Sequence, residues 1–175
     1  MDNFAEQLVK RSETSADKTR RILTLAVGVL FTISLTGLAL LQLTRPLMAL
    51  LGFLLAVAAG YGTYFLVQNS YVEYEYTFTN GELDVDKIIA KRKRSGMVTA
   101  DIKKFTAFGK YTDGMEETDD MTVVIASDNI ASHEYYADFE HEEYGTTRLI
   151  FAPDERILEN IKHTLPAKLK YELKD

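Results

Sequence analysis

The stretch Ile22–Val67 decides the fold, because Arg45 is its only residue that is charged at neutral pH. Thr44-Arg45-Pro46 divides it into ILTLAVGVLFTISLTGLALLQL (Ile22–Leu43) and LMALLGFLLAVAAGYGTYFLV (Leu47–Val67), runs of 22 and 21 residues. As a helix, each run is long enough to cross the ~30 Å apolar core of a bilayer. Helices buried in a soluble protein seldom stay apolar on every face over two such runs. The sequence therefore predicts a transmembrane helical hairpin.

The charges divide the chain into three parts. Residues 1–21 carry five basic and four acidic residues, and residues 71–175 carry 14 basic and 22 acidic residues, so this last part has a net charge of −8. We expect a cytoplasmic N-terminal tail (1–21), the transmembrane hairpin (22–67) and a cytoplasmic domain (71–175). The acidic balance argues against nucleic acid as a partner. The absence of cysteine excludes disulfides and thiolate chemistry.

Basic residues near the two spans predict the orientation. Positive charges concentrate before the first span and after the second, while the connector carries only Arg45. By the positive-inside rule, the chain is predicted to be a multi-pass protein of the plasma membrane with both termini cytoplasmic. The tail is expected to form a frayed or interfacial helix, with Phe4, Leu8 and Val9 resting on the lipid headgroups.

Small residues recur every fourth position within both spans and so line one face of each helix. They are Gly28, Thr32 and Thr36 in the first span and Gly52, Ala56 and Gly60 in the second. Such faces let two helix backbones approach closely in lipid. Packing within the hairpin is the preferred interpretation, because the short connector already makes the helices neighbours, and a homo-oligomer interface is the alternative. The oligomeric state is not predicted. Ionisable residues are missing from the middle of the spans, which disfavours a transporter or an ion channel.

From Tyr71 the pattern changes to a period of two, with alternating apolar and polar residues up to Thr79. Asn80-Gly81 then predicts a type I′ turn between two antiparallel strands, because both residues readily adopt positive φ. A two-residue loop fixes the register, so that Phe78 faces Leu83. The same register places Glu75 opposite Asp86, a like-charge pair that counts mildly against it.

The same register places a basic run, Lys91, Arg92, Lys93 and Arg94, back beside Tyr71, at the level of the inner membrane surface. Most basic runs are solvated turns. Contact with anionic lipid headgroups is the alternative, to which each basic side chain contributes about 1 kcal/mol.

The remaining sequence predicts further short strands and one helix. The strands are expected at Met97–Ala100, Ile102–Phe108, Met121–Ala126, Glu134–Glu140 and Thr147–Phe151, with a polar loop at Lys110–Asp120. An amphipathic helix is expected to begin at Pro153 and to stop at Pro166. About seven antiparallel strands closed by a C-terminal helix have the order of a pleckstrin-homology-like (PH-like) barrel. The predicted class is therefore an α+β membrane protein.

The hairpin, the stretch Tyr74–Asp86 (YEYTFTNGELDVD) and the basic run after it carry a resemblance to a known family. The chain resembles small, functionally uncharacterised bacterial membrane proteins with a two-helix hairpin and a cytoplasmic PH-like domain. The resemblance covers most of the chain. It implies a membrane-tethered, non-enzymatic domain without an established ligand. Eukaryotic proteins of this fold place phosphoinositide-binding basic residues around the first strand loop, whereas here Glu82 and Asp84 make that loop acidic.

Candidate catalytic or metal-binding residues are few. His133 and His141 lie eight residues apart on a predicted strand, ~26 Å, which is too far to share a metal. Acidic residues 116–120 lack the spacing of a calcium loop and are expected to be solvated or to face a basic partner. We therefore predict no cofactor and no enzymatic activity. The predicted function is a membrane-anchored PH-like module that binds a protein or lipid partner, and the alternative is a structural or regulatory subunit of a larger membrane complex.

Overall fold

The computed structural model describes residues 3–112, 114–130 and 133–172. The chain separates into two compact units, and each is described by itself below. One unit is helical and spans Glu13–Tyr71. The other is a domain that combines Met1–Ser12 with Val72–Asp175. The helical unit is thus inserted between two parts of one domain.

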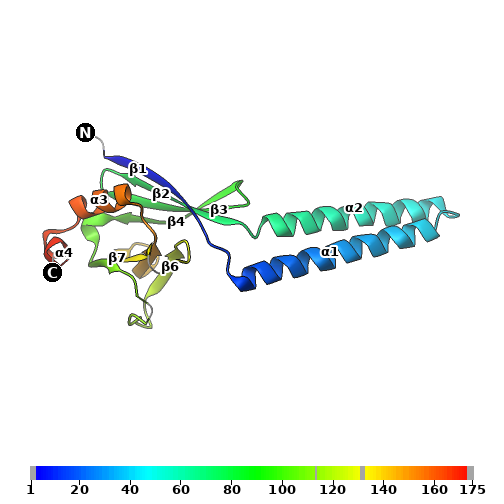
Figure 1. Cartoon of the computed structure of the whole chain (residues 1–175). Helices are drawn as coiled ribbons and strands as arrows, with labels where there is room; N and C mark the ends of the chain where they lie inside the picture. Colours follow the sequence, from blue (N-terminus) through cyan, green and yellow to red (C-terminus); the bar gives the residue numbers. More distant parts are fainter. Residues whose placement is uncertain (1–2, 113, 131–132, 173–175) are drawn as a thin grey trace. The chain divides into compact units, whose positions relative to one another are not determined.

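The helical unit is an antiparallel pair, α1 (Ser15–Leu41) and α2 (Pro46–Gln68), which lie side by side (Figure 1). Helix α1 begins before Ile22, the predicted start, because Thr14 and Asp17 form a capping box that starts the helix there. Pro46 stands at the first turn of α2, where a missing N–H costs nothing.

Both helices are long and apolar enough to cross a membrane. Only 6% of the most apolar 18-residue window of either helix is buried, whereas the core helix of a soluble protein would be mostly buried. Large exposed side chains such as Leu30, Leu41 and Val57 cover the pair on the outside. This exposed apolar surface indicates association with a membrane.

The first sheet of the domain contains β1 (Phe4–Lys10), β2 (Val72–Thr79), β3 (Glu82–Ile89) and β4 (Lys93–Asp101), in that order. All neighbouring strands in it are antiparallel. The register predicted from Asn80-Gly81 is confirmed, because Phe78 pairs with Leu83 and Glu75 pairs with Asp86.

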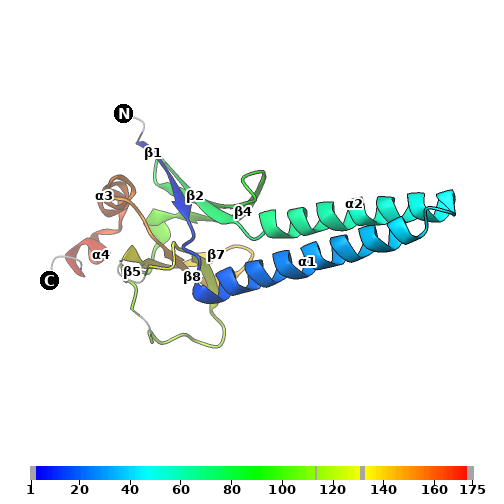
Figure 2. The same ribbon diagram turned by 45° about the vertical axis from the view of Figure 1, so that its right-hand side comes forward.

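Strand β1 overturns the interpretation of the N-terminal tail. Phe4–Lys10 is not a frayed or interfacial helix but an edge strand of the domain, paired along its length with β2. Ala5 and Val9 are buried in the core, so Val9 does not rest on headgroups. Gln7 ties the strand to the C-terminal part of the chain: its amide accepts from the Asp154 N–H at 2.7 Å and donates to the Ala152 carbonyl at 3.0 Å. Figure 2 shows β1 beside β2.

The second sheet contains β5 (Ala107–Lys110), β7 (Tyr135–His141), β8 (Gly145–Phe151) and β6 (Thr122–Ala126), in that order. Strand β6 runs parallel to β8, whereas an all-antiparallel arrangement was predicted. The predicted strand Ile102–Phe108 is also wrong, because the Asp101 side chain caps a short 3₁₀ turn, η1 (Ile102–Lys104), and β5 starts only at Ala107.

One core joins the two sheets and the C-terminal helix. Tyr76 and Phe78 from the first sheet, Leu149 and Phe151 from the second, and Ile157 from α3 (Glu155–Thr164) are all fully buried. The Tyr76 hydroxyl donates to the Ala126 carbonyl and accepts from the Ala152 N–H, and burial raises its pKa. A short helix α4 (Ala167–Glu172) follows Pro166. Within the described residues the eight strands form two sheets rather than a closed barrel.

Candidate functional site

The basic run forms the turn between β3 and β4 and the first residues of β4. Ala90 and Lys91 both have left-handed backbone conformations, with φ of 53° and 56°. The Arg92 N–H donates to the Ile89 carbonyl at 3.1 Å and closes the turn. Lys91 and Arg92 are exposed, as are Lys93 and Arg94, which belong to β4. The turn therefore projects its cations into the surroundings of the domain.

The left-handed conformation is unfavourable for alanine and lysine, because their Cβ atoms crowd the backbone. Residues held there typically cost about 1–3 kcal/mol each, and such positions cluster at functional sites. The pairing of β3 with β4 keeps Ala90 and Lys91 in place, because Ile89 pairs with Lys93 across the turn.

Arg94 differs from the other three cations because it has partners inside the domain. Its guanidinium forms an ion pair with the Glu75 carboxylate, and its Nε lies 3.9 Å from Asp86 Oδ2. Glu75 and Asp86 are direct neighbours across β2 and β3. Arg94 thus offsets the like-charge pair that counted against the register. Its role is structural, whereas Lys91, Arg92 and Lys93 remain available to a ligand.

Glu75 lies in the middle of the face of the first sheet that points away from the core. Its side chain is only 8% exposed. Burial raises the pKa of Glu75, as does a hydrogen bond with Glu6, while the Arg94 guanidinium lowers it. The causes that raise the pKa, which include the nearby charges of Glu6 and Asp86, prevail, so Glu75 binds a proton more readily in the fold than a free glutamate does.

The basic turn lies at one end of the first sheet. At this end Val72 pairs with Ile89, and Ile89 with Lys93. Lys10, the last residue of β1, pairs with Glu73 near the start of β2. Both chain connections to the helical unit therefore leave from the same end of the sheet as the basic turn.

The predicted small-residue positions of the helical unit lie between its two helices. A Cβ atom added to Gly28 would collide with the Thr63 side chain, and one added to Gly52 would lie 2.7 Å from the Ala39 Cβ. Gly60 is less crowded, because its Cβ would lie 3.8 Å from the Thr32 methyl group. Of these three glycines, Gly28 and Gly52 are therefore the ones most tightly packed against the other helix.

The remaining positions of that set are buried or half-buried. Ala56 is buried, and the hydroxyls of Thr32 and Thr36 donate to the carbonyls of Gly28 and Thr32, one turn earlier in α1. Their hydrogen bonds are satisfied within their own helix. They act as small side chains rather than as polar links between helices.

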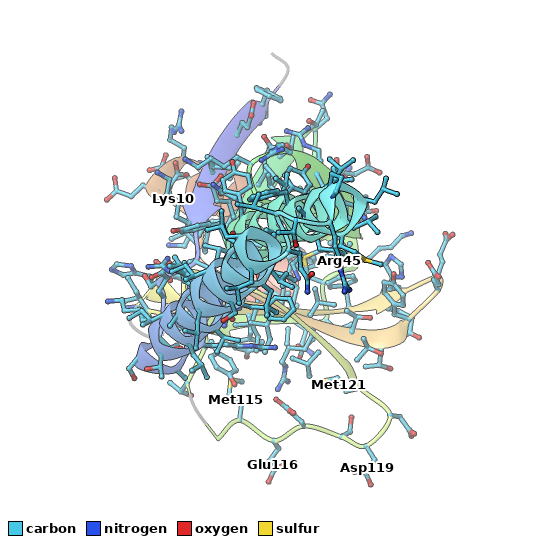
Figure 3. The ribbon with its side chains drawn as sticks, turned by 90° about the vertical axis from the view of Figure 1, so that its right-hand side faces the viewer. Lys10, Arg45, Met115, Glu116, Asp119 and Met121 are labelled. Atoms are coloured by element: carbon cyan, nitrogen blue, oxygen red, sulfur yellow. The ribbon has the colours of Figure 1, made fainter. Side chains whose placement is uncertain are left out.

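An ion pair that sequence reasoning missed lies on the outer face of the second sheet. Arg148 donates from Nε and Nη2 to both carboxylate oxygens of Asp138, at 2.7 Å each, and stacks against the Tyr136 ring. Its Nη1 donates to the Glu116 carbonyl at 3.0 Å and so anchors the acidic loop between β5 and β6. The side chains of Glu116 and Asp119 project away from that loop (Figure 3). Asp138 pairs with Arg148 across β7 and β8, so this ion pair can be predicted only once the register of the two strands is known.

The two candidate histidines have separate surroundings. His133 lies 3.5 Å from the Asp128 carboxylate, and His141 stacks on Tyr144. Within residues 3–112, 114–130 and 133–172, no group of three or more His, Asp or Glu side chains is arranged to hold a metal ion.

Comparison with known proteins places the chain in a family. No curated protein and no solved structure matches it. A family model described as "Bacterial PH-like domain (DUF6106)" matches residues 1–171. The match includes β1, both helices, both sheets and α3, so the insertion of a helical pair after the first strand lies within the family's own pattern. PH-like domains are binding modules. The chain thus belongs to the bacterial PH-like domain family DUF6106.

Proposed function

We propose that this protein is a membrane-anchored, non-enzymatic PH-like module whose basic turn, Lys91–Lys93, binds anionic lipid headgroups at the cytoplasmic membrane surface. One observation carries the proposal. The turn holds two consecutive residues, Ala90 and Lys91, in an unfavourable backbone conformation at the end of the sheet from which both connections to the helices leave.

The connections are too short to let this end move far from the membrane. Four residues separate β1 from α1, and three separate α2 from β2. An extended residue spans at most ~3.6 Å, so the longer connection reaches on the order of 15 Å. Because adjacent strands hold both connections, both ends of the hairpin should lie on the same side of the membrane.

The sidedness follows from the positive-inside rule. Arg20 and Arg21 lie near the start of the first span, and Lys91–Lys93 follow the second, while the connector carries only Arg45. This distribution supports a cytoplasmic domain. The inner leaflet of a membrane is the one that carries a negative surface potential.

The electrostatic gain is sufficient for a tethered domain. Each of the three cations contributes about 1 kcal/mol within a Debye length, ~8 Å, of an anionic surface. The net charge of −8 on residues 71–175 opposes this attraction. Tethering by the helices removes most of the entropic cost of association, so a weak local attraction is enough to orient the domain.

A second candidate function is a subunit of a larger membrane complex. Gly37 and Gly62 favour it, because a Cβ added at either position would meet no atom within 4 Å apart from the nearby backbone of its own helix and its chain neighbours. Small residues on the outside of the pair would let the helix of another protein approach closely. Gly37→Leu and Gly62→Leu should then abolish co-purification of a partner in mild detergent, regardless of salt.

The lipid proposal is tested on the full chain, which contains no cysteine, so one introduced cysteine carries a spin label specifically. Ser95→Cys places the label beside the basic turn, and Glu82→Cys places the control label at the other end of the sheet. In lipid nanodiscs with anionic phosphatidylglycerol, the label at 95 should be less accessible to a water-soluble relaxation agent than in phosphatidylcholine alone. High salt should remove the difference.

The variant Lys91→Gln, Arg92→Gln, Lys93→Gln should remove the same difference, while Arg94 stays in place to keep the fold. The label at 82 should behave alike in both lipids. Equal accessibility of the label at 95 in both lipids at low salt would overturn the proposal.

A further inference from the structure

A cleft of about 410 Å³ lies beside β4, between the strands β3 and β4 and the turn that joins β7 to β8. Its volume is in the range of ligand sites in proteins. Among the residues that the structure describes, β4 is the last strand of its sheet, so one of its sides has no strand partner. An unpaired strand edge presents N–H and C=O groups to an incoming extended chain.

A bulge opens the strand edge at the cleft. The pairing of β3 with β4 shifts by one residue, because Val85 pairs with Val98 while Asp86 pairs with Gly96. Met97 is the extra residue of the bulge. Gly96 has no side chain to cover its neighbour, and a Cβ there would lie 3.6 Å from Asp86 Oδ1. That carboxylate oxygen thus faces the space above Gly96.

Two carboxylates of β3 line the cleft, and neither is fully neutralised within the domain. Asp84 accepts the Thr99 hydroxyl at 2.5 Å on Oδ1 only. Asp86 has Arg94 at 3.9 Å from Oδ2, which is beyond hydrogen-bond distance. Glu143 contributes a third acidic side chain from the turn, and no lysine or arginine lines the cleft.

An aromatic surface forms the opposite wall. The rings of His141 and Tyr144 stack with their centres 4.6 Å apart and an interplanar angle of 13°. His141 Nδ1 accepts the backbone N–H groups of Glu143 and Tyr144, at 3.2 and 3.3 Å, which fixes this ring in place. Tyr144 is 40% exposed, so part of its ring is open to a ligand. An aromatic face attracts cations, and arginine most often.

We propose that this cleft binds an arginine or lysine side chain from an extended, basic segment of a partner protein. The cation lies between the carboxylates of Asp84 and Asp86 and the ring of Tyr144. The backbone of the segment runs along the free edge of β4. This contact lies on a different surface from the basic turn and does not depend on the lipid contact.

The electrostatic field around the cleft is negative, like the cleft itself. The register places further carboxylates on the face of the first sheet that points away from the core, against only two cations, Lys10 and Arg94. These carboxylates are Glu6, Glu73, Glu75, Glu82 and Asp101. Such a field raises the rate at which a basic segment is captured and disfavours an acidic one.

The test uses the full chain in nanodiscs of phosphatidylcholine, so that anionic lipid plays no part. The probe is a short, fluorescently labelled peptide of alternating arginine and threonine, which presents all its cations on one face when extended. Its binding is followed by fluorescence anisotropy at low salt. A matched peptide with glutamate in place of arginine should not bind.

Asp84→Asn and Asp86→Asn should each weaken binding about three- to fivefold, because each removes one charge without changing the shape. Tyr144→Leu should weaken it about threefold through loss of the aromatic face. Glu159→Gln, an exposed acid of α3, is the matched control and should have no effect. Thermal unfolding of each variant establishes that it is folded.

Three results would overturn the proposal. The peptide fails to bind at low salt, or the cleft variants bind it as the Glu159→Gln control does. In the third, spermidine binds as tightly as the peptide and with the same sensitivity to the cleft variants, which would make the ligand a free polyamine rather than a protein segment.

Discussion

Two turns in the first sheet each hold two consecutive residues at positive φ, but they are built from residue types with different backbone preferences. Between β2 and β3, Asn80 and Gly81 have φ of 50° and 101°. Between β3 and β4, Ala90 and Lys91 have φ of 53° and 56°. Asparagine and glycine adopt positive φ at little cost, whereas alanine and lysine do not. The residues of the β2–β3 turn therefore suit its backbone conformation, whereas those of the β3–β4 turn do not.

The surroundings of the two turns explain the difference. Gly81 is buried, and its carbonyl accepts the Ile102 N–H at 3.0 Å, so the first turn is part of the packed domain. Lys91 and Arg92 are exposed, and the turn that holds them belongs to the end of the sheet where the chain connects to the helices. A residue choice that lowers stability without improving packing indicates a role outside the fold.

The largest loss of stability is expected at the β2–β3 turn, Asn80-Gly81, which is packed into the domain. Gly81→Val forces a β-branched residue to φ near 101° and places its Cβ about 3.2 Å from the Thr164 methyl group. We expect the free energy of unfolding to fall by about 3 kcal/mol. Denaturant unfolding of the full chain in detergent, followed by tyrosine fluorescence, measures it. Asn80→Gly is the control and should stay within about 1 kcal/mol of the wild type.

The second prediction places the residue types of the β2–β3 turn, Asn and Gly, at the first two positions of the β3–β4 turn. Ala90→Asn combined with Lys91→Gly should raise the free energy of unfolding by about 1–2 kcal/mol, because both positions then suit positive φ. Lys91→Gln alone keeps the backbone cost and removes the same charge, so it should leave stability unchanged. If the double variant is no more stable than Lys91→Gln, the backbone of this turn is not strained.

The third prediction separates the cations of the basic run. Arg94→Gln removes the partner of the buried Glu75 and should lower the free energy of unfolding by about 1 kcal/mol, a modest loss because the Arg94 side chain is 60% exposed. Arg92→Gln should change it by less than ~0.5 kcal/mol. The same denaturant titration compares the stability of the two variants. Equal losses of stability would show that Arg94 has no structural role beyond that of Arg92.

The smallest effect concerns the pH dependence of stability beside Arg94. The pKa of Glu75 is raised in the fold, so the folded state binds its proton more tightly than the unfolded chain does. The stability from this group is present below the unfolded pKa, near 4.3, and is lost as pH rises through the folded value. Glu75→Gln should therefore flatten the decline in thermal stability just above pH 4.5. An unchanged profile would show that Glu75 titrates normally.

The sequence predicted the parts of the fold that depend on local signals. Two apolar runs around Pro46 indicated the helical pair, and Asn80-Gly81 determined the register of β2 with β3. The position of the basic run at the β3–β4 turn followed from that register. Each of these inferences needs only neighbouring residues.

Strand β1 was missed because its partner lies more than sixty residues away and its pattern is mixed. Ala5, Gln7 and Val9 face the core side. Phe4 and Leu8 are also apolar, but they lie on the other face and are exposed. A strand with apolar residues on both faces gives no clear alternation. A short charged segment before a hydrophobic span also resembles an interfacial helix.

The contacts of the candidate sites were missed for a similar reason. The ion pairs of Arg148 with Asp138 and of Arg94 with Glu75 join residues on different strands, so they appear only once registers are known. The cleft depends on the bulge at Met97 and on the approach of the β7–β8 turn, neither of which has a local signal.

The position of β1 ahead of the helices has a consequence for biosynthesis. The ribosome completes β1 before it makes the hairpin, and β2, its only partner strand among the described residues, follows after about sixty more residues. At about 5–20 residues per second, this interval lasts several seconds. During that time the two helices are synthesised while β1 has no partner strand. The first sheet of the domain is therefore completed only after both helices have been synthesised.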